Sequence, residues 1–267
     1  MTNFLLRVLG APLRYIMLAL WEIQSYAKLS GRAIACIFTR PVYFKEIILQ
    51  MDRIGVGSLV IITLTGFFTG AVLAIQSEGA LRTYGAVSMT GRLVAMTLIR
   101  ELGPVLTALM LSGRIGAGIA SELGSMVVSE QINAMRALGT DPIRRLVTPR
   151  VTAMILMLPV LTIVCDIVGM LGGWLIATRK LLISSSQFWA EAINTLHRSD
   201  VAGTFIKPVV FGFIIAMTGC YVGLRAKGGT EGVGKATTHA VVSSSIFIIV
   251  ADFFLNNLLI YLAPLIN

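Results

Sequence analysis

Four ionisable side chains lie inside long apolar stretches of this sequence. They are two cations and two carboxylates: Arg100, Glu101, Lys207 and Asp252. Each would cost roughly 2.5–3.5 kcal/mol or more if it stood alone in hydrocarbon. Equal numbers of opposite charge favour mutual pairing between helices, although a proton or substrate relay remains open. Asp166 also lies within an apolar stretch, has no obvious partner, and is expected either to face water or to take a proton.

The glycine-rich segment 229–236 is a second candidate for chemistry, because it reads Gly-Thr-Glu-Gly-Val-Gly-Lys-Ala. It is close to the phosphate-binding loop, whose last residue is a Ser or Thr that holds magnesium. Ala236 has no hydroxyl, and the segment connects two apolar stretches rather than a strand and a helix. A glycine-rich turn is the better interpretation, and ATP would have to be bound by another subunit.

Catalytic and metal-binding chemistry is poorly supported. His197 and His239 are far apart in the sequence and stand in no metal-ligand spacing. No Gly-x-Ser-x-Gly elbow is present. Cys36, Cys165 and Cys220 are widely spaced and are expected to be small buried hydrophobes. We therefore expect no catalytic residue, no metal ion and no cofactor on this chain.

Residues 129–139 predict a short amphipathic helix in a polar stretch of the chain. Three apolar residues recur at three-residue steps and share one face: Ile132, Met135 and Leu138. Ser129 is expected to cap the start of the helix, Gly139 to end it in the left-handed conformation, and Pro142 to prevent its continuation. An isolated helix this short is marginal in water. It should pack either against the membrane surface and its own chain or in the groove of a cytoplasmic motor subunit.

The elements that must position these residues are membrane-spanning helices. The chain is 56% hydrophobic and 13% charged, whereas a soluble domain carries about 25% charged residues. Apolar stretches of about 20 residues can cross a bilayer. Five such stretches are present: residues 54–77, 93–113, 151–178, 201–224 and 240–263. The sequence predicts an all-α integral membrane protein, with residues 54–267 as one five-span domain.

Residues 1–53 carry charges too often for a span and predict an amphipathic interfacial segment, broken at Pro12 and Pro41. Fifteen Lys and Arg residues lie in this segment and in the connections after the second and fourth spans, against five on the other side. The positive-inside rule then predicts a cytoplasmic N-terminus and a periplasmic C-terminus. The net charge of +9 forms no basic face with interleaved aromatics, which argues against nucleic acid as a partner.

Small residues recur at four-residue spacing inside three of the spans. The pairs are Gly66 with Gly70, Gly169 with Gly173, and Gly219 with Gly223. Such pairs let helix backbones approach closely in lipid. They are expected either to pack the helices of one chain or to form a homodimer seam.

Seven short motifs follow one another along the chain. They read Leu98-Ile-Arg-Glu-Leu-Gly-Pro104, Ser112-Gly-Arg-Ile-Gly116, Glu122-Leu-Gly124, Glu130-Gln-Ile-Asn-Ala-Met135, Gly139-Thr-Asp-Pro142, Thr148-Pro-Arg150 and Gly232-Val-Gly-Lys-Ala-Thr-Thr238. In this order they resemble the MlaE-type permease family of Mla and Mce lipid ABC transporters. The similarity covers roughly residues 50–260.

The resemblance implies a homodimeric permease subunit in a bacterial inner membrane. It would move phospholipid or a related lipid between that membrane and an MCE-domain lipid-binding protein. ATP and Mg would be bound by a separate cytoplasmic ABC ATPase, which a STAS-domain regulator often joins. The four intramembrane charges fall where family members also place such charges.

Two sets of site residues come from the resemblance alone. The segment implied to couple to the ATPase contains Glu130, Gln131, Ile132, Met135, Leu138, Asp141 and Pro142. The positions implied to line a lipid pocket around the end of the first span are Leu73, Gln76, Leu81 and Tyr84.

Two other functions remain open on the sequence. A proton-coupled secondary transporter would use Asp166, Glu101 and Asp252 as proton carriers and would work without an ATPase. A purely structural membrane anchor would tolerate replacement of the intramembrane charges as a neutral set.

Overall fold

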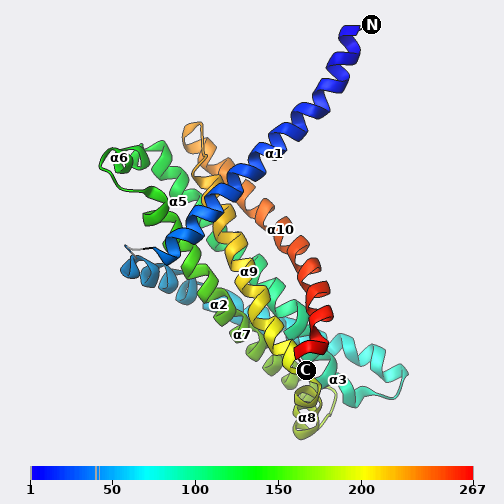
Figure 1. Ribbon diagram of the computed structural model, residues 1–267. Coiled ribbons are helices and arrows are strands. Elements are labelled where there is room, and N and C mark those ends of the chain that lie inside the picture. The colour runs from blue at the N-terminus through cyan, green and yellow to red at the C-terminus, as the bar shows by residue number, and fades with distance from the viewer. Residues whose placement is uncertain (1, 40, 42, 267) are drawn as a thin grey trace.

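The computed structural model describes residues 2–39, 41 and 43–266, and every regular element in these ranges is a helix (Figure 1). The α-helices are α1 (Thr2–Phe38), α2 (Phe44–Thr83), α3 (Thr90–Thr97), α4 (Gly103–Leu111), α5 (Ala117–Val128), α6 (Gln131–Ala137), α7 (Thr148–Arg179), α8 (Ser185–Thr195), α9 (Arg198–Gly223) and α10 (Gly229–Ile266). Five helical stretches within the described residues are long and apolar enough to cross a membrane: Phe44–Thr83, Val87–Val128, Ile143–Arg179, Ala202–Gly223 and Gly229–Leu262. The predicted all-α membrane fold with five spans is confirmed.

The helices extend beyond most of the predicted spans. α2 begins at Phe44, just after Pro41, so residue 53, the expected end of the N-terminal segment, lies inside a helix. α1 continues through Pro12, and the predicted break there is wrong. A proline removes one backbone hydrogen bond and bends a helix, but it does not end the helix when the remaining bonds are in place.

The second span is a single helical path from Val87 to Val128 that contains two π-helical segments, Leu98–Leu102 and Ser112–Gly116. The sequence placed the end of this span at residue 113, because the chain becomes more polar beyond it. The helix continues because Ile119 and Leu123 are buried in the main core, so α5 still has an apolar face to pack. The connection to the third span is correspondingly short and contains α6.

Glycine pairs bring α2 and α7 into backbone contact. A Cβ atom added to Gly70 would lie 1.8 Å from the carbonyl oxygen of Gly169, and one added to Gly66 would lie 2.6 Å from that of Cys165. α9 approaches the second span in the same way, since a Cβ on Gly219 would lie 3.0 Å from the carbonyl oxygen of Gly116. The prediction that these pairs pack helices of one chain is confirmed.

The bundle has two distinct ends (Figure 1). α6 lies at one end beyond α5, and α3 and α8 pack together at the other. α1 contacts α7 and α9 on the outside of the bundle, and its N-terminal part extends away from it. α10 is the least buried of the five spans and exposes a row of large apolar side chains.

Candidate functional site

The π-helical segment Leu98–Leu102 places Arg100 and Glu101 toward α9 and α10. Pro104 follows it and has no N–H to donate back to the preceding turn. α9 supplies donors to the carbonyls of this turn. Lys207 Nζ donates to the Arg100 oxygen at 2.7 Å, and Thr204 Oγ1 donates to the Ile99 oxygen at 3.4 Å. π-Helical insertions occur frequently at functional sites, and this one is satisfied by side chains from another span.

Lys207 is the centre of a charge cluster that joins three spans. Its side chain is buried, with the whole residue 1% exposed. Its Nζ lies 3.2 Å from Glu101 Oε2 and 3.2 Å from Asp252 Oδ1. Asn256 Nδ2 donates to Glu101 Oε2 at 2.8 Å and to Asp252 Oδ2 at 3.4 Å, which closes the network from α10. One cation and two carboxylates therefore hold the second span, α9 and α10 together.

Arg100 pairs elsewhere, with Asp200. Its Nε lies 2.8 Å from Asp200 Oδ1, and its Nη2 donates to Asp200 Oδ2 at 2.9 Å, so the contact is bidentate. Asp200 also accepts the backbone N–H of His197 at 2.9 Å and thus caps α9. Asp200 was not predicted from the sequence, because the predicted fourth span begins at residue 201. An Asp in the first turn of a helix is a recognised capping signal that could have identified it.

Asp166 is brought next to the same π-helical segment but is not part of the charge cluster. The residue is 6% exposed, and neither carboxylate oxygen has a hydrogen-bond partner within the described part of the chain. A Cβ added to Gly103 would lie 1.8 Å from Asp166 Oδ1, so a larger residue at the start of α4 would force the carboxyl group to shift. The structure thus leaves this carboxyl group buried between α7 and the second span.

α6 presents an anchored side and a free side. Ile132 is 4% exposed and fixes the helix to the bundle, Met135 is half-buried, and Leu138 is 82% exposed. Gly139 follows with φ +75°, in the left-handed conformation expected for it. The expected Ser129 cap is wrong. The N-cap is Glu130 at φ 57°, and the Ser129 hydroxyl donates instead to the Ser125 carbonyl at 2.8 Å.

The segment after α6 is fixed by Asp141. Its Oδ1 accepts the backbone N–H of Ile143 at 3.0 Å, and its Oδ2 lies 3.5 Å from Arg32 Nη2 on α1. Pro142 is buried, whereas Gln131 is exposed. Of the seven residues implied to couple to an ATPase, the most accessible apolar one is therefore Leu138.

The four positions implied to line a lipid pocket lie near the C-terminal end of α2, opposite α6. Leu73 packs against the apolar cluster formed with α3, α7 and α8, and Leu81 is half-buried. Gln76 is exposed and Tyr84 is 83% exposed. One chain does not enclose these four side chains.

The glycine-rich segment 229–236 is largely helical, which corrects its interpretation as a turn. Gly228 and Gly229 have positive φ angles of 91° and 68° and form the turn itself, after which the chain enters the first turns of α10. The three cysteines are free, and Cys165 and Cys220 are buried as expected, whereas Cys36 is only half-buried. Within the described ranges there is no group of three or more His, Cys, Asp or Glu residues that could hold a metal ion.

Five apolar spans, three of them joined by an intramembrane charge cluster, define an α-helical integral membrane protein of the polytopic, transporter-like class. Comparison with known proteins identifies the family. Residues 47–258 match the family model described as Permease MlaE, and the chain belongs to this family.

Three relatives show the extent of the similarity. A "Probable ABC transporter permease protein" of Rickettsia felis is 42% identical over 89% of this chain and 92% of its own length. "Protein TRIGALACTOSYLDIACYLGLYCEROL 1, chloroplastic" of Arabidopsis thaliana is 37% identical over 92% of this chain and 69% of its own. The "Intermembrane phospholipid transport system permease protein MlaE" of Haemophilus influenzae is 36% identical over 80% of this chain and 82% of its own.

Proposed function

We propose that this chain is the membrane subunit of an ABC transporter that moves phospholipid or a related lipid between the bacterial inner membrane and an MCE-domain lipid-binding protein. The observation that carries the proposal is the similarity to a permease named for intermembrane phospholipid transport, which covers 82% of that relative's length. The chain itself is a passive gate in this proposal. ATP and Mg are bound by a separate ABC ATPase, on which a STAS-domain regulator can act.

The proposed contact with the ATPase is α6 and the turn after it. Leu138 projects from the end of the bundle, while Ile132 and Pro142 are buried and hold the segment to the chain. An ATPase that binds Leu138 would therefore transmit its movement to α5 and α7 rather than to a flexible loop. Helix-in-groove recognition uses apolar side chains that share one face of a helix, and half-buried Met135 and exposed Leu138 stand three residues apart on such a face.

The proposed orientation places α6 in the cytoplasm and the C-terminus in the periplasm. Basic residues gather at the α6 end, where Arg53 and Arg150 both pair with Glu122, at 3.7 and 2.9 Å, and Arg32 pairs with Asp141. This supports the assignment because Lys and Arg are enriched on the cytoplasmic side of membrane proteins.

A homodimer is proposed because one chain leaves both a lipid pocket and an apolar helix face incomplete. Gln76 and Tyr84 are exposed at the end of α2, and α10 carries exposed Phe253 and Phe254 outside the cavity that α1, α9 and α10 enclose. A second copy placed against these residues would enclose a pocket continuous with the bilayer. Closure of the two ATPases would then narrow the pocket and move lipid to or from the outer partner.

The test is reconstitution of the chain in vesicles with its candidate ATPase and MCE-domain partners. We expect ATP-dependent transfer of a fluorescent phospholipid, no transfer when any one component is omitted, and phospholipid among the molecules that copurify, identified by mass spectrometry. Hydrolysis of ATP by the isolated chain, or transfer without the ATPase, would contradict the proposal.

A proton-coupled secondary transporter is the second candidate, and buried Asp166 is the observation that favours it. It predicts transport by the purified chain alone, driven by a pH gradient across the vesicle membrane. The same vesicles therefore separate the two functions. Transport that follows the pH gradient and ignores ATP supports the second, and the reverse supports the first.

A further inference from the structure

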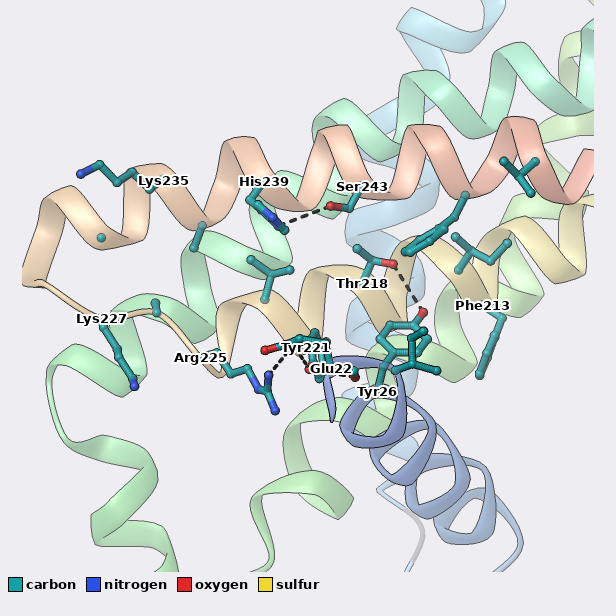
Figure 2. A pocket seen from close by; sticks show the side chains of 18 of the residues that line it. Glu22, Tyr26, Phe213, Thr218, Tyr221, Arg225, Lys227, Lys235, His239 and Ser243 are labelled. Carbon is teal, nitrogen blue, oxygen red and sulfur yellow. Dashed lines mark hydrogen bonds and ion pairs between the residues drawn. The ribbon is translucent and has the colours of Figure 1, made fainter. Parts of the chain in front are cut away.

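A cavity of about 940 Å³ lies between α1, α9 and α10 (Figure 2). This volume is in the range of small-molecule binding sites, roughly 300–1,000 Å³. The cavity is separate from the positions expected to line a lipid pocket, because Leu73 packs at the α3 and α8 end of the bundle. We refer to it below as the α1–α9–α10 groove.

The wall of the groove formed by α1 is fastened to α9. Glu22 accepts a hydrogen bond from the hydroxyl of Tyr221, and its Oε2 lies 2.6 Å from Arg225 Nη1. One turn further along α1, the Tyr26 hydroxyl lies 3.4 Å from Thr218 Oγ1. Burial raises the pKa of Tyr26 above that of an ordinary tyrosine, which is already protonated at neutral pH. α1 is thus held in place while the space between it and α10 stays open (Figure 2).

The groove is basic at one end and apolar at the other (Figure 2). Lys227 and Lys235 lie at the end where α9 turns into α10, and Phe213 lies at the opposite end. Phe247 and Val250 of α10 continue the apolar part and are half exposed. A molecule with one charged end and one long apolar end matches this layout.

The basic end has an excess of positive charge. Arg225, Lys227 and Lys235 line it, and Glu22 is the one carboxylate among the lining residues. Glu22 is engaged by Arg225, and Lys235 pairs with Glu231 at 2.7 Å in a largely exposed contact. Exposed pairs of this kind are weak. No ion pair engages Lys227 in the part of the chain that the structure describes, so the end attracts an anion.

We propose that the α1–α9–α10 groove binds one phospholipid with an anionic headgroup, whose phosphate lies beside Lys227 and Lys235 and whose acyl chain lies along Phe213, Phe247 and Val250. Basic side chains at the membrane surface attract anionic lipids, and the apolar end opens toward hydrocarbon. The lipid would come from the cytoplasmic leaflet, and this assignment rests on the proposed orientation of the chain. Lipid binding itself requires only that the chain is inserted in a membrane.

Lipid retention by the purified full-length chain tests the headgroup end. The protein is extracted from vesicles of equal parts phosphatidylglycerol and phosphatidylcholine, washed in detergent, and its bound lipid is measured by mass spectrometry. We expect the wild type to retain phosphatidylglycerol, and the double variant Lys227→Gln/Lys235→Gln to retain at least about threefold less. The control Arg179→Gln/Lys180→Gln removes two cations at the far end of α7 and should retain the wild-type amount. Equal retention by both double variants would overturn the proposal.

The apolar end is tested by filling it. Ser243→Trp places an indole in the groove, and Ile246→Trp places one on an exposed position of the same helix outside the groove. We expect Ser243→Trp to lower retention by a similar factor and Ile246→Trp to leave it unchanged. Retention that is the same in both variants would contradict a lipid chain in this groove.

A photo-crosslinker identifies the occupant directly. With p-benzoylphenylalanine at Phe213, irradiation in membranes should attach a phospholipid, seen as a mass increase of one lipid on the chain. A cross-linked dimer or a cross-link to another protein would overturn the proposal. None of these measurements needs an ATPase or transport, so the groove and the proposed function can fail independently.

Discussion

Lys207 Nζ donates a hydrogen bond of 2.7 Å to the carbonyl oxygen of Arg100, four residues before Pro104. In a regular helix that carbonyl would accept the N–H of the residue at position 104, which a proline lacks. The ammonium group from α9 replaces the missing donor, and the same group pairs with Glu101 and Asp252. One buried cation therefore satisfies the backbone of one span and pairs with carboxylates from two.

Replacement of Lys207 by Met should be strongly destabilising. It leaves the carboxylates of Glu101 and Asp252 without their cation and the Arg100 carbonyl without its donor. Removal of one partner from a buried ion pair costs about 3–5 kcal/mol. The free energy of unfolding, measured in mixed micelles against increasing SDS, should fall by this order, whereas exposed Lys180→Met should change it by less than about 0.5 kcal/mol.

A neutral triple variant separates charge balance from shape. Lys207→Met/Glu101→Gln/Asp252→Asn removes the cation and both carboxylates together, and should recover much of the stability lost in Lys207→Met. A triple variant as unstable as the single one would show that the ion pairs are not what stabilises this junction. Full stability with loss of ATP-dependent lipid transfer would instead assign the cluster to the transport cycle rather than to an inert anchor.

Gly103→Ala should be destabilising because the added methyl group would meet the carboxyl group of Asp166, with Cβ 1.8 Å from Oδ1. Overpacking of this kind costs about 1–3 kcal/mol. The measurement is again SDS unfolding, with Gly113→Ala as the control, since a Cβ there meets nothing within 4 Å. If the clash is the cause, Asp166→Ala should rescue Gly103→Ala in a double-mutant cycle. Additive effects of the two changes would contradict it.

The sequence predicted the parts of this fold that depend on hydrophobicity and spacing. Apolar length identified five spans, and four-residue glycine spacing identified residues at which helices approach closely, but not that α2 and α7 are the helices that meet. It could not predict where helices continue through polar residues, as α5 does, because that depends on which face finds a partner in the core. Hydrophobic periodicity also did not predict the π-helical segments or the turn at Gly228 that precedes α10.

The candidate site was predicted in composition but not in pairing. Lys207 converges with Glu101 and Asp252 as opposite charges in a bilayer should, since the ammonium group stabilises both carboxylates. Arg100 turns away from them toward Asp200, a residue one position outside the predicted span. Which carboxylate an arginine selects is set by helix rotation, and the π-helical insertion changes that rotation locally.

Gly70→Ala should separate α2 from α7. The new methyl group would lie 1.8 Å from the Gly169 carbonyl oxygen, which is backbone and cannot rotate away. We expect a loss of about 1–3 kcal/mol in the free energy of unfolding, or more if the helices shift. Gly79→Ala on the same helix has open space around it and should instead be neutral or stabilising by up to about 1 kcal/mol. Equal effects at both positions would mean that the α2–α7 contact is looser than described.

Leu138→Asp should abolish coupling to the ATPase without unfolding the chain. The side chain is 82% exposed, so its replacement should change the free energy of unfolding by less than about 0.5 kcal/mol. If the residue inserts into an apolar groove of the motor, a carboxylate there would lose the burial of a leucine, about 1.5–3 kcal/mol, and add a desolvation penalty. Copurification with the ATPase and ATP-dependent lipid transfer should both fall at least tenfold.

Met135→Arg, on the half-buried face of α6, should lower both by the same order. The control is Leu182→Asp, an equally exposed leucine at the opposite end of the bundle, which should retain both activities. Wild-type coupling in Leu138→Asp and Met135→Arg would place the motor contact elsewhere on the chain.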